Sequence, residues 1–191
     1  MRLFIGIDLS DDVKRGAAVA AETLRAELSR VAPRTVLRWV NASNLHITLW
    51  FLGEVDEQRT ESITTALAPP FTTRSFDLGI AGTGVFPGSG APRAMWLGIR
   101  EGAPSLVAIH AELTPRLARV GFEPEARPYS PHLTIARFKD VRRADVAPVR
   151  RLLAHMSPDA GACRIDAVTL FRSRPSSKGS EYQQLLRVPL Q

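Results

Sequence analysis

The chain lacks the features that mark a secreted, disulfide-stapled or membrane-spanning protein. Its 191 residues include a single cysteine, Cys163, which cannot form an internal disulfide and has no Cys or His neighbour at metal-ligand spacing. The apolar run near the N-terminus breaks at Asp8, and no stretch approaches the roughly 20 apolar residues of a membrane span. We therefore expect a soluble, cytoplasmic protein in which Cys163 is a small buried hydrophobic residue.

Lysine is also scarce, because most of the 25 basic residues are arginines, and the net charge is +6. Arginine suits phosphate recognition, since its planar guanidinium donates bidentate hydrogen bonds. Coding bias toward arginine would produce the same composition, so the charge is compatible with a nucleic-acid substrate without selecting one. Hydrophobic residues at 45% and charged residues at 23% are typical of a globular chain, and the length suits one compact domain.

The apolar patterns predict strands and helices in an order that loosely repeats. Strands are expected at residues 3–8, 36–40, 45–52, 75–80, 95–99, 132–138, 165–171 and 182–189, and helices at 13–31, 56–67, 104–120 and 146–156. Ser10 or Asp11 can cap the first helix, Asp56 can cap the second, and Pro115 should kink or shorten the third. The glycines and prolines of 82–92 predict a loop. This mixture indicates an α+β fold with two similar lobes.

The informative feature is a repeated tetrapeptide. It reads His46-Ile47-Thr48-Leu49 in the first half and His132-Leu133-Thr134-Ile135 in the second, each within a predicted strand. Random placement of the His and Thr residues would give roughly 0.25 His-x-Thr occurrences in a chain of this composition. Two copies, both flanked by aliphatic residues, therefore exceed coincidence.

The spacing places each histidine and its threonine on one face of a strand, because alternate residues of a strand share a face. The aliphatic residues between them then pack on the other face. If the lobes face each other, two imidazoles and two hydroxyls converge. One imidazole can take a proton from water while the other protonates a leaving oxygen, since histidine's pKa of about 6.5 keeps both forms available. The hydroxyls of Thr48 and Thr134 can donate to phosphate oxygens in the transition state.

Two other interpretations fit the motifs less well. Either histidine alone is more often a hydrogen-bonded strand residue than a catalytic one. A metal site would need a third ligand, and neither motif contains Cys, Asp or Glu, although distant carboxylates could contribute. Phosphodiester chemistry without a metal explains both copies together.

These motifs resemble those of the two-histidine (2H) phosphoesterase superfamily. The surrounding segments RLFIGIDL, RWVNASNLHITLWFLGEV, RAMWLGI and RPYSPHLTIARF are similar, in order over nearly the whole chain, to bacterial and archaeal RNA 2′,3′-cyclic phosphodiesterases, also called 2′-5′ RNA ligase-like or LigT-like proteins. The resemblance implies one domain over residues 1–191. It has two intertwined, pseudo-symmetric lobes, each with an antiparallel-rich sheet and helices, and an active site in the central cleft.

The resemblance also implies a reaction. It is the hydrolysis of a 2′,3′-cyclic phosphate at an RNA end, such as that of a tRNA fragment, to a 2′-phosphomonoester, with no cofactor or metal. His46 would be the proton donor to the 3′ oxygen and His132 the acceptor that activates water. The sequence itself does not assign the two parts. We expect the protein to act as a monomer away from membranes.

Other residues carry weaker expectations. Arg137 occupies a position where similar proteins have a basic residue that reaches phosphate, although strict alternation turns it away from His132. Trp50 stands where similar proteins often have lysine, and alternation puts it on the face of His46, as a wall of the lobe or a base-stacking surface. By resemblance, Phe4 and Tyr182 are candidates for a base pocket. His110 and His155 lie in predicted helices without a threonine partner, and we expect both to be non-catalytic.

Alternative functions use the same residues. The site could act on small cyclic nucleotides, on ADP-ribose 1″,2″-cyclic phosphate or as a reversible 2′-5′ RNA ligase. A different class of function is a non-catalytic module that binds RNA ends. The intact His and Thr of both motifs favour an enzyme.

Overall fold

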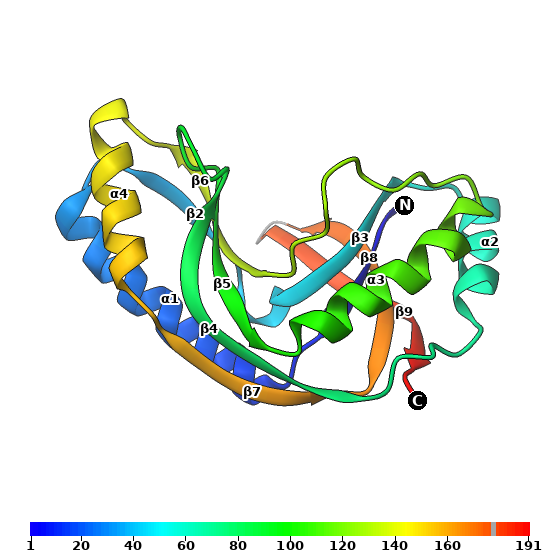
Figure 1. Ribbon diagram of the computed structural model, residues 1–191. Helices are drawn as coiled ribbons and strands as arrows, with labels where there is room; N and C mark the ends of the chain where they lie inside the picture. The colour runs from blue at the N-terminus through cyan, green and yellow to red at the C-terminus, as the bar shows by residue number, and fades with distance from the viewer. Residues whose placement is uncertain (177–178) are drawn as a thin grey trace.

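The protein is built on one curled, antiparallel sheet with helices at both ends (Figure 1). The structure, a computed structural model, describes residues 1–176 and 179–191. The described helices are α1 (Asp11–Val31), α2 (Glu57–Leu67), α3 (Ala103–Ala118) and α4 (Arg143–His155), with a 3-10 turn at Ala42–Asn44. The described strands are β1 (Arg2–Asp8), β2 (Val36–Trp39), β3 (His46–Glu54), β4 (Phe76–Phe86), β5 (Ala94–Glu101), β6 (Leu133–Asp140), β7 (Asp159–Ile165), β8 (Ala167–Ser176) and β9 (Gly179–Pro189).

The sheet has two halves that meet at a narrow junction. Its strand order is β7-β4-β5-β6-β3-β1-β8-β9, and β2 pairs with β6. The central strands β3 and β6 are bridged through one pair of residues, Ile47 and Leu133. Helices α1 and α4 contact β7 and β4 in one half, whereas α3 contacts β3 and α2 in the other (Figure 1). The predicted α+β fold with two lobes is confirmed, and the lobes are halves of a single sheet.

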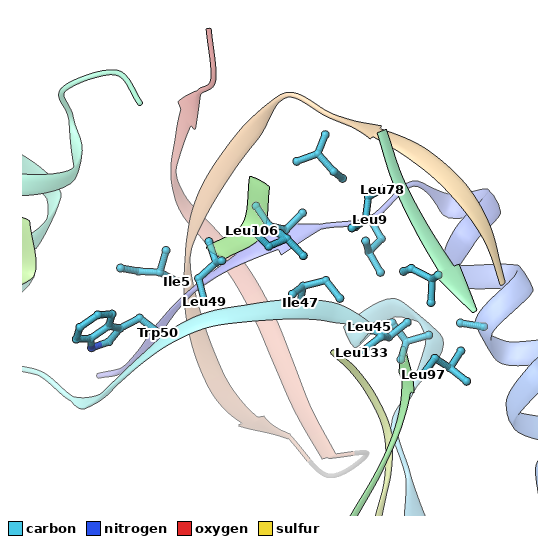
Figure 2. Close-up of a cluster of buried hydrophobic side chains, with 14 of the residues drawn as sticks. Ile5, Leu9, Leu45, Ile47, Leu49, Trp50, Leu78, Leu97, Leu106 and Leu133 are labelled. Carbon is cyan, nitrogen blue, oxygen red and sulfur yellow. The ribbon is translucent and has the colours of Figure 1, made fainter. Parts of the chain in front are cut away.

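The helices form where caps and apolar stripes coincide. The Ser10 side chain accepts a hydrogen bond from the backbone N–H of Val13, and Asp56 accepts one from that of Arg59, so both predicted caps are confirmed. The buried stripe of α1 is the predicted one from Val13 to Leu28, whereas Val31 at the end of the helix is 40% exposed. Apolar residues of both halves join in one cluster, in which Ile47, Leu97 and Leu133 lie near the junction of the sheet (Figure 2).

Some element boundaries differ from the predictions. The glycines at 82 and 84 do not break β4, which continues to Phe86 because β5 pairs with it as far as Ala94. A strand at Asp159–Ile165 was not predicted, because its first five residues, Asp-Ala-Gly-Ala-Cys, have short side chains that carry little apolar pattern. Helix α3 contains Pro115 and ends three residues later. The predicted β8–β9 hairpin is confirmed, but its strands are longer than predicted, since β8 continues to Ser176 and β9 begins at Gly179; residues 177–178 lie outside the described part of the chain.

Two smaller expectations concern Cys163 and the helices. Cys163 is a free thiol, half-buried rather than buried, and packs against the hydrophobic cluster. Among the described helices, none combines the length and the apolar character needed to cross a membrane.

Candidate active site

The junction of the two half-sheets brings the two motifs together. The pairing of Ile47 with Leu133 joins the middle residues of both His-x-Thr triplets in antiparallel register. Continued by one residue each way, this register sets His46 opposite Thr134 and Thr48 opposite His132. In a regular antiparallel pair, diagonal neighbours such as the two histidines then lie about 7–8 Å apart. Two imidazoles that extend from backbone positions this far apart can contact one phosphate from two sides.

Both imidazoles are held by the same local contact. His46 Nδ1 lies 2.7 Å from the carbonyl oxygen of Asn44, and His132 Nδ1 lies 2.8 Å from that of Ser130. A carbonyl only accepts, so Nδ1 carries a proton in each ring and Nε2 is the nitrogen left for chemistry. The two motifs therefore present equivalent nitrogens in equivalent tautomers.

His46 sits within an aromatic enclosure. Its ring lies 4.6 Å from that of Phe4 and 5.2 Å, edge-on, from that of Tyr182, and Phe171 stacks on Phe4. Thr48 Oγ1 is 3.0 Å from His46 Nε2 and can donate to it. Burial in this enclosure lowers the pKa of His46 below its usual value, against the opposing effect of the Asn44 carbonyl. Phe4 is itself buried, so its ring packs against the imidazole and limits its movement.

A carboxylate stands beside His46. Asp8 pairs with His46 across β1 and β3, and its negative charge raises the pKa of that imidazole, which Lys14 counteracts. Lys14 Nζ lies 2.7 Å from Asp8 Oδ1, and Gln184 donates to Asp8 Oδ2 at 2.8 Å. A cavity of about 110 Å³ adjoins these groups, and its lining includes Asp8, His46, Tyr182 and Gln184.

His132 has a sparser setting. Its ring meets Phe86 edge-on at 4.9 Å, and Phe86 in turn packs on Trp96, which pairs with Thr134 across β5 and β6. Only glycine fits at residue 84, because a Cβ there would lie 2.3 Å from the Trp96 ring. Burial lowers the pKa of His132, and the charge of Arg137 acts in the same direction. Within the described residues, no hydrogen bond joins His132 to Thr134.

A register shift follows each motif by one residue. In β3, Thr48 pairs with Gly6 and Trp50 with Ile5, so Leu49 is an extra residue. In β6, Thr134 pairs with Trp96 and Ala136 with Met95, so Ile135 is the extra residue. Such bulges reverse the faces of the residues that follow them. The two strands thus share a sequence motif and also the irregularity behind it.

The bulge in β6 turns Arg137 toward the histidines. Arg137 pairs with Ala94, two residues from Trp96 on β5, and therefore shares the face of Thr134. Its positive charge, after the larger effect of burial, lowers the pKa of both His46 and His132. The objection from strict alternation is removed, and a role of Arg137 in binding substrate stays a prediction.

The bulge in β3 makes the expected face of Trp50 wrong, and with it the base-stacking surface, whereas burial of the indole agrees with a wall of the lobe. Trp50 is 7% exposed and lies in the hydrophobic cluster (Figure 2). It pairs with Ile5, which puts it on the opposite face from His46. The residue that shares the face of His46 is Phe51, which pairs with Phe4 and is 60% exposed. Alternation failed here because the extra residue Leu49 shifts the strand by one position.

Trp50 belongs instead to a stack of three rings. His110 of α3 lies between the Trp50 indole at 5.1 Å and the Tyr129 ring at 4.4 Å, and its burial lowers its pKa. The Tyr129 hydroxyl donates to the carbonyl oxygen of Thr48 at 3.0 Å. The loop that leads into His132 is thereby fastened to the strand that carries His46. The expectation that His110 has no catalytic part stays a prediction.

Several groups of this site were not identified from the sequence. The carbonyls of Asn44 and Ser130 carry no residue-type signal, because any residue supplies a backbone oxygen. Asp8 and Tyr129 could have been noticed within the segments RLFIGIDL and RPYSPH, yet their contacts depend on strands that are distant in sequence. No group of three His, Cys, Asp or Glu side chains suited to a metal ion occurs in residues 1–176 and 179–191.

Comparison with known proteins assigns the family. The model of the 2′-5′ RNA ligase superfamily matches residues 13–176. The chain belongs to the 2′-5′ RNA ligase superfamily. The resemblance inferred from the two motifs is therefore confirmed at the level of the family.

Relatives of this superfamily member are similar over most of their length. The RNA 2′,3′-cyclic phosphodiesterase of Archaeoglobus fulgidus is 30% identical over 185 residues, which cover 97% of this chain and 98% of that protein. The protein of the same name from Thermotoga maritima is 38% identical over 140 residues, covering 73% and 71% of the two chains. Escherichia coli LigT in complex with 3′-AMP superposes with a TM-score of 0.74 at 27% identity, covering 99% of this chain and 97% of that one.

Proposed function

We propose that this member of the 2′-5′ RNA ligase superfamily hydrolyses 2′,3′-cyclic phosphodiester ends of RNA to 2′-phosphomonoesters. The observation that carries the proposal is the pair of imidazoles on bridged strands, each with Nδ1 on a carbonyl and Nε2 left for chemistry. The names of the relatives from Archaeoglobus fulgidus and Thermotoga maritima supply the substrate class.

In the proposed mechanism, His132 Nε2 accepts a proton from water as the water oxygen attacks phosphorus. The bond from phosphorus to O3′ then breaks, and O3′ takes the proton of His46 Nε2. The products are a 2′-phosphomonoester and a free 3′-hydroxyl. Exchange of protons with solvent restores His46 to its protonated form and His132 to its neutral form. The charges balance without a further reactant.

The surroundings of the two rings support this assignment of roles. Asp8 is a carboxylate beside His46, and a negative charge favours the imidazolium that a proton donor must be. Burial and the positive charge of Arg137 lower the pKa of both rings, but among the described residues no carboxylate opposes them at His132, so the neutral imidazole that a proton acceptor must be is favoured there. The Asp8 carboxylate is therefore the difference that favours His46 as donor and His132 as acceptor.

Thr48, Thr134 and Arg137 would bind the phosphate. Their side chains share the face of the histidines through the strand register and the β6 bulge. Hydroxyl and guanidinium donors aimed at non-bridging oxygens stabilise the charge that develops in the transition state.

The deciding experiment uses an oligonucleotide that ends in a 2′,3′-cyclic phosphate, with excess EDTA present. We expect release of a 2′-phosphomonoester end at the same rate with and without EDTA. Full loss of activity under EDTA would show that the reaction needs a metal. Tight binding without turnover under any condition would favour the RNA-end-binding module.

The oligomeric state, the location and the substrate range of the protein are also open to test. We propose a single domain over residues 1–191 that acts as a cytoplasmic monomer on RNA ends such as those of tRNA fragments. Light scattering and cell fractionation test the monomeric state and the location. Turnover of cyclic mononucleotides, ADP-ribose 1″,2″-cyclic phosphate and 2′-5′ linkages, measured beside the RNA substrate, tests the range.

A further inference from the structure

An unusual pair of like charges lies beside the candidate site. Arg38 of β2 and Arg137 of β6 are directly opposite in the register of the two strands. Both side chains are exposed, and neither forms an ion pair within the described residues. Like charges directly opposite each other destabilise a sheet. A bound anion would remove that cost.

The neighbouring residue shows which way Arg38 faces. Trp39 pairs with the buried Ala136, and the guanidinium of Arg25 on α1 lies 4.9 Å from its ring. Trp39 therefore faces α1, and alternation turns Arg38 to the other side of β2. That side is the one to which the β6 bulge turns Arg137 and Thr134.

The two arginines differ in how closely they approach the reacting groups. The charge of Arg137 acts on the pKa of both His46 and His132, whereas that of Arg38 is felt at Tyr182. Burial raises the pKa of Tyr182, and the positive charges of Arg137, Arg2 and Arg38 oppose that effect. Arg38 thus lies on the approach to the site, one strand farther out than Arg137.

We infer that Arg38 binds the phosphodiester next to the cyclic end, so that the site takes an RNA chain in preference to a cyclic mononucleotide; this inference rests on the proposed function. Arg137 then binds the reacting phosphate, and Arg38 binds the next phosphate along the RNA. Guanidiniums on neighbouring strands suit two successive phosphates, because each can donate two parallel hydrogen bonds to one anion. A mononucleotide carries no second phosphate and cannot use Arg38.

The test compares two substrates in three proteins. Arg38→Ala and Arg151→Ala each remove one exposed arginine, and Arg151 lies on α4, away from both motifs. The substrates are a tetranucleotide with a 2′,3′-cyclic end and a 2′,3′-cyclic mononucleotide. For Arg38→Ala we expect KM for the tetranucleotide to rise roughly tenfold, as for loss of a charged hydrogen bond. Turnover of the mononucleotide should not change, and Arg151→Ala should match the wild type on both substrates.

The salt dependence gives a second readout. Each phosphate contact contributes about −0.7 to the slope of log affinity against log salt for a single strand. Arg38→Ala should make the slope for the tetranucleotide shallower by about that amount, and Arg38→Lys should restore most of it because the charge is kept.

Binding of a 3′-phosphorylated tetranucleotide, followed by fluorescence anisotropy, separates this inference from the proposed function. If the wild type turns over neither substrate, the proposed function fails, and weaker binding by Arg38→Ala would still support the contact. Equal binding by Arg38→Ala and the wild type would overturn the inference. So would an equal loss of turnover on both substrates.

Discussion

The two His-x-Thr strands are alike in backbone and unlike in surroundings. Both place Nδ1 on the carbonyl two residues earlier, and both have a bulge directly after the threonine. Around His46, however, three aromatic rings, a threonine hydroxyl and an ion-paired carboxylate are in place. Around His132, Phe86 is the main aromatic neighbour, and the charge of Arg137 acts on both rings.

The difference indicates that the two imidazoles have different roles in proton transfer. A repeated backbone delivers two imidazoles in the same tautomer, and the side chains around each then favour one protonation state. The residues after the bulges differ in the same way, because equivalent positions hold the exposed Phe51 in β3 and Arg137 in β6. Pseudo-symmetry in the sheet is therefore combined with asymmetry in the chemistry.

Removal of either imidazole should have the largest effect. We expect His46→Ala and His132→Ala each to lower kcat by about 10²–10⁴-fold, the usual contribution of a general acid or base. The double variant should be little worse than the poorer single variant if both groups serve one step. Steady-state kinetics on a cyclic-ended oligonucleotide measure this, with the exposed His155→Ala as the control.

Other results for the histidine variants would contradict a shared role of the two strands in one step. If one of the two variants kept most of the wild-type rate, the acid–base pairing would be wrong. If the losses in the double variant multiplied, the two rings would act in separate steps.

Replacement of either threonine should lower kcat by a smaller factor than loss of a histidine, and the two strands should differ in the size of that loss. Thr48→Val and Thr134→Val each remove a donor to phosphate and should lower kcat by roughly 10²-fold. Thr48→Val should be the more damaging, since it also removes the hydroxyl that lies 3.0 Å from His46 Nε2. Single-turnover rates of the two variants give the comparison, and equal losses would mean that the hydrogen bond to His46 has no part in the reaction.

The sequence predicted the faces of the strand residues correctly up to the two bulges, and it did not predict which way the residues after them face. The pairing of His46 with Thr48 and of His132 with Thr134 needed only the two-residue period of a strand. The faces of Trp50 and Arg137 did not follow, because Leu49 and Ile135 are extra residues whose aliphatic side chains look like any strand residue. Whether a strand contains a bulge depends on its partner strands, which lie far away in the sequence.

The pH dependence of the reaction should reveal which imidazole is the donor. Asp8→Asn removes a charge that raises the pKa of His46, and Lys14→Gln removes one that lowers it. If His46 is the donor, its loss of a proton sets the alkaline limb of kcat/KM. We expect Asp8→Asn to move that limb to lower pH and Lys14→Gln to move it to higher pH.

The same pair of variants can contradict the assignment. Movement of the acidic limb instead, with the alkaline limb unchanged, would make His46 the acceptor. Because both residues lie beside His46 and neither acts on the pKa of His132, the second ring serves as the internal control. A profile identical to the wild type in both variants would show that the ion pair has no part in setting the protonation of His46.

Loss of the contact between the loop before His132 and strand β3 should give the smallest effect. Tyr129→Phe removes the hydrogen bond to the Thr48 carbonyl and should lower the free energy of unfolding by about 1 kcal/mol, measured by urea denaturation. The stack on His110 survives this change. In a cycle of Tyr129→Ala with His110→Ala, the stack should appear as a coupling of about 0.5–1.5 kcal/mol. If Tyr129→Phe also lowers kcat several-fold, the hydroxyl positions the loop before His132. Unchanged kcat with lowered stability would mean that Tyr129 only stabilises the packing of this loop on β3.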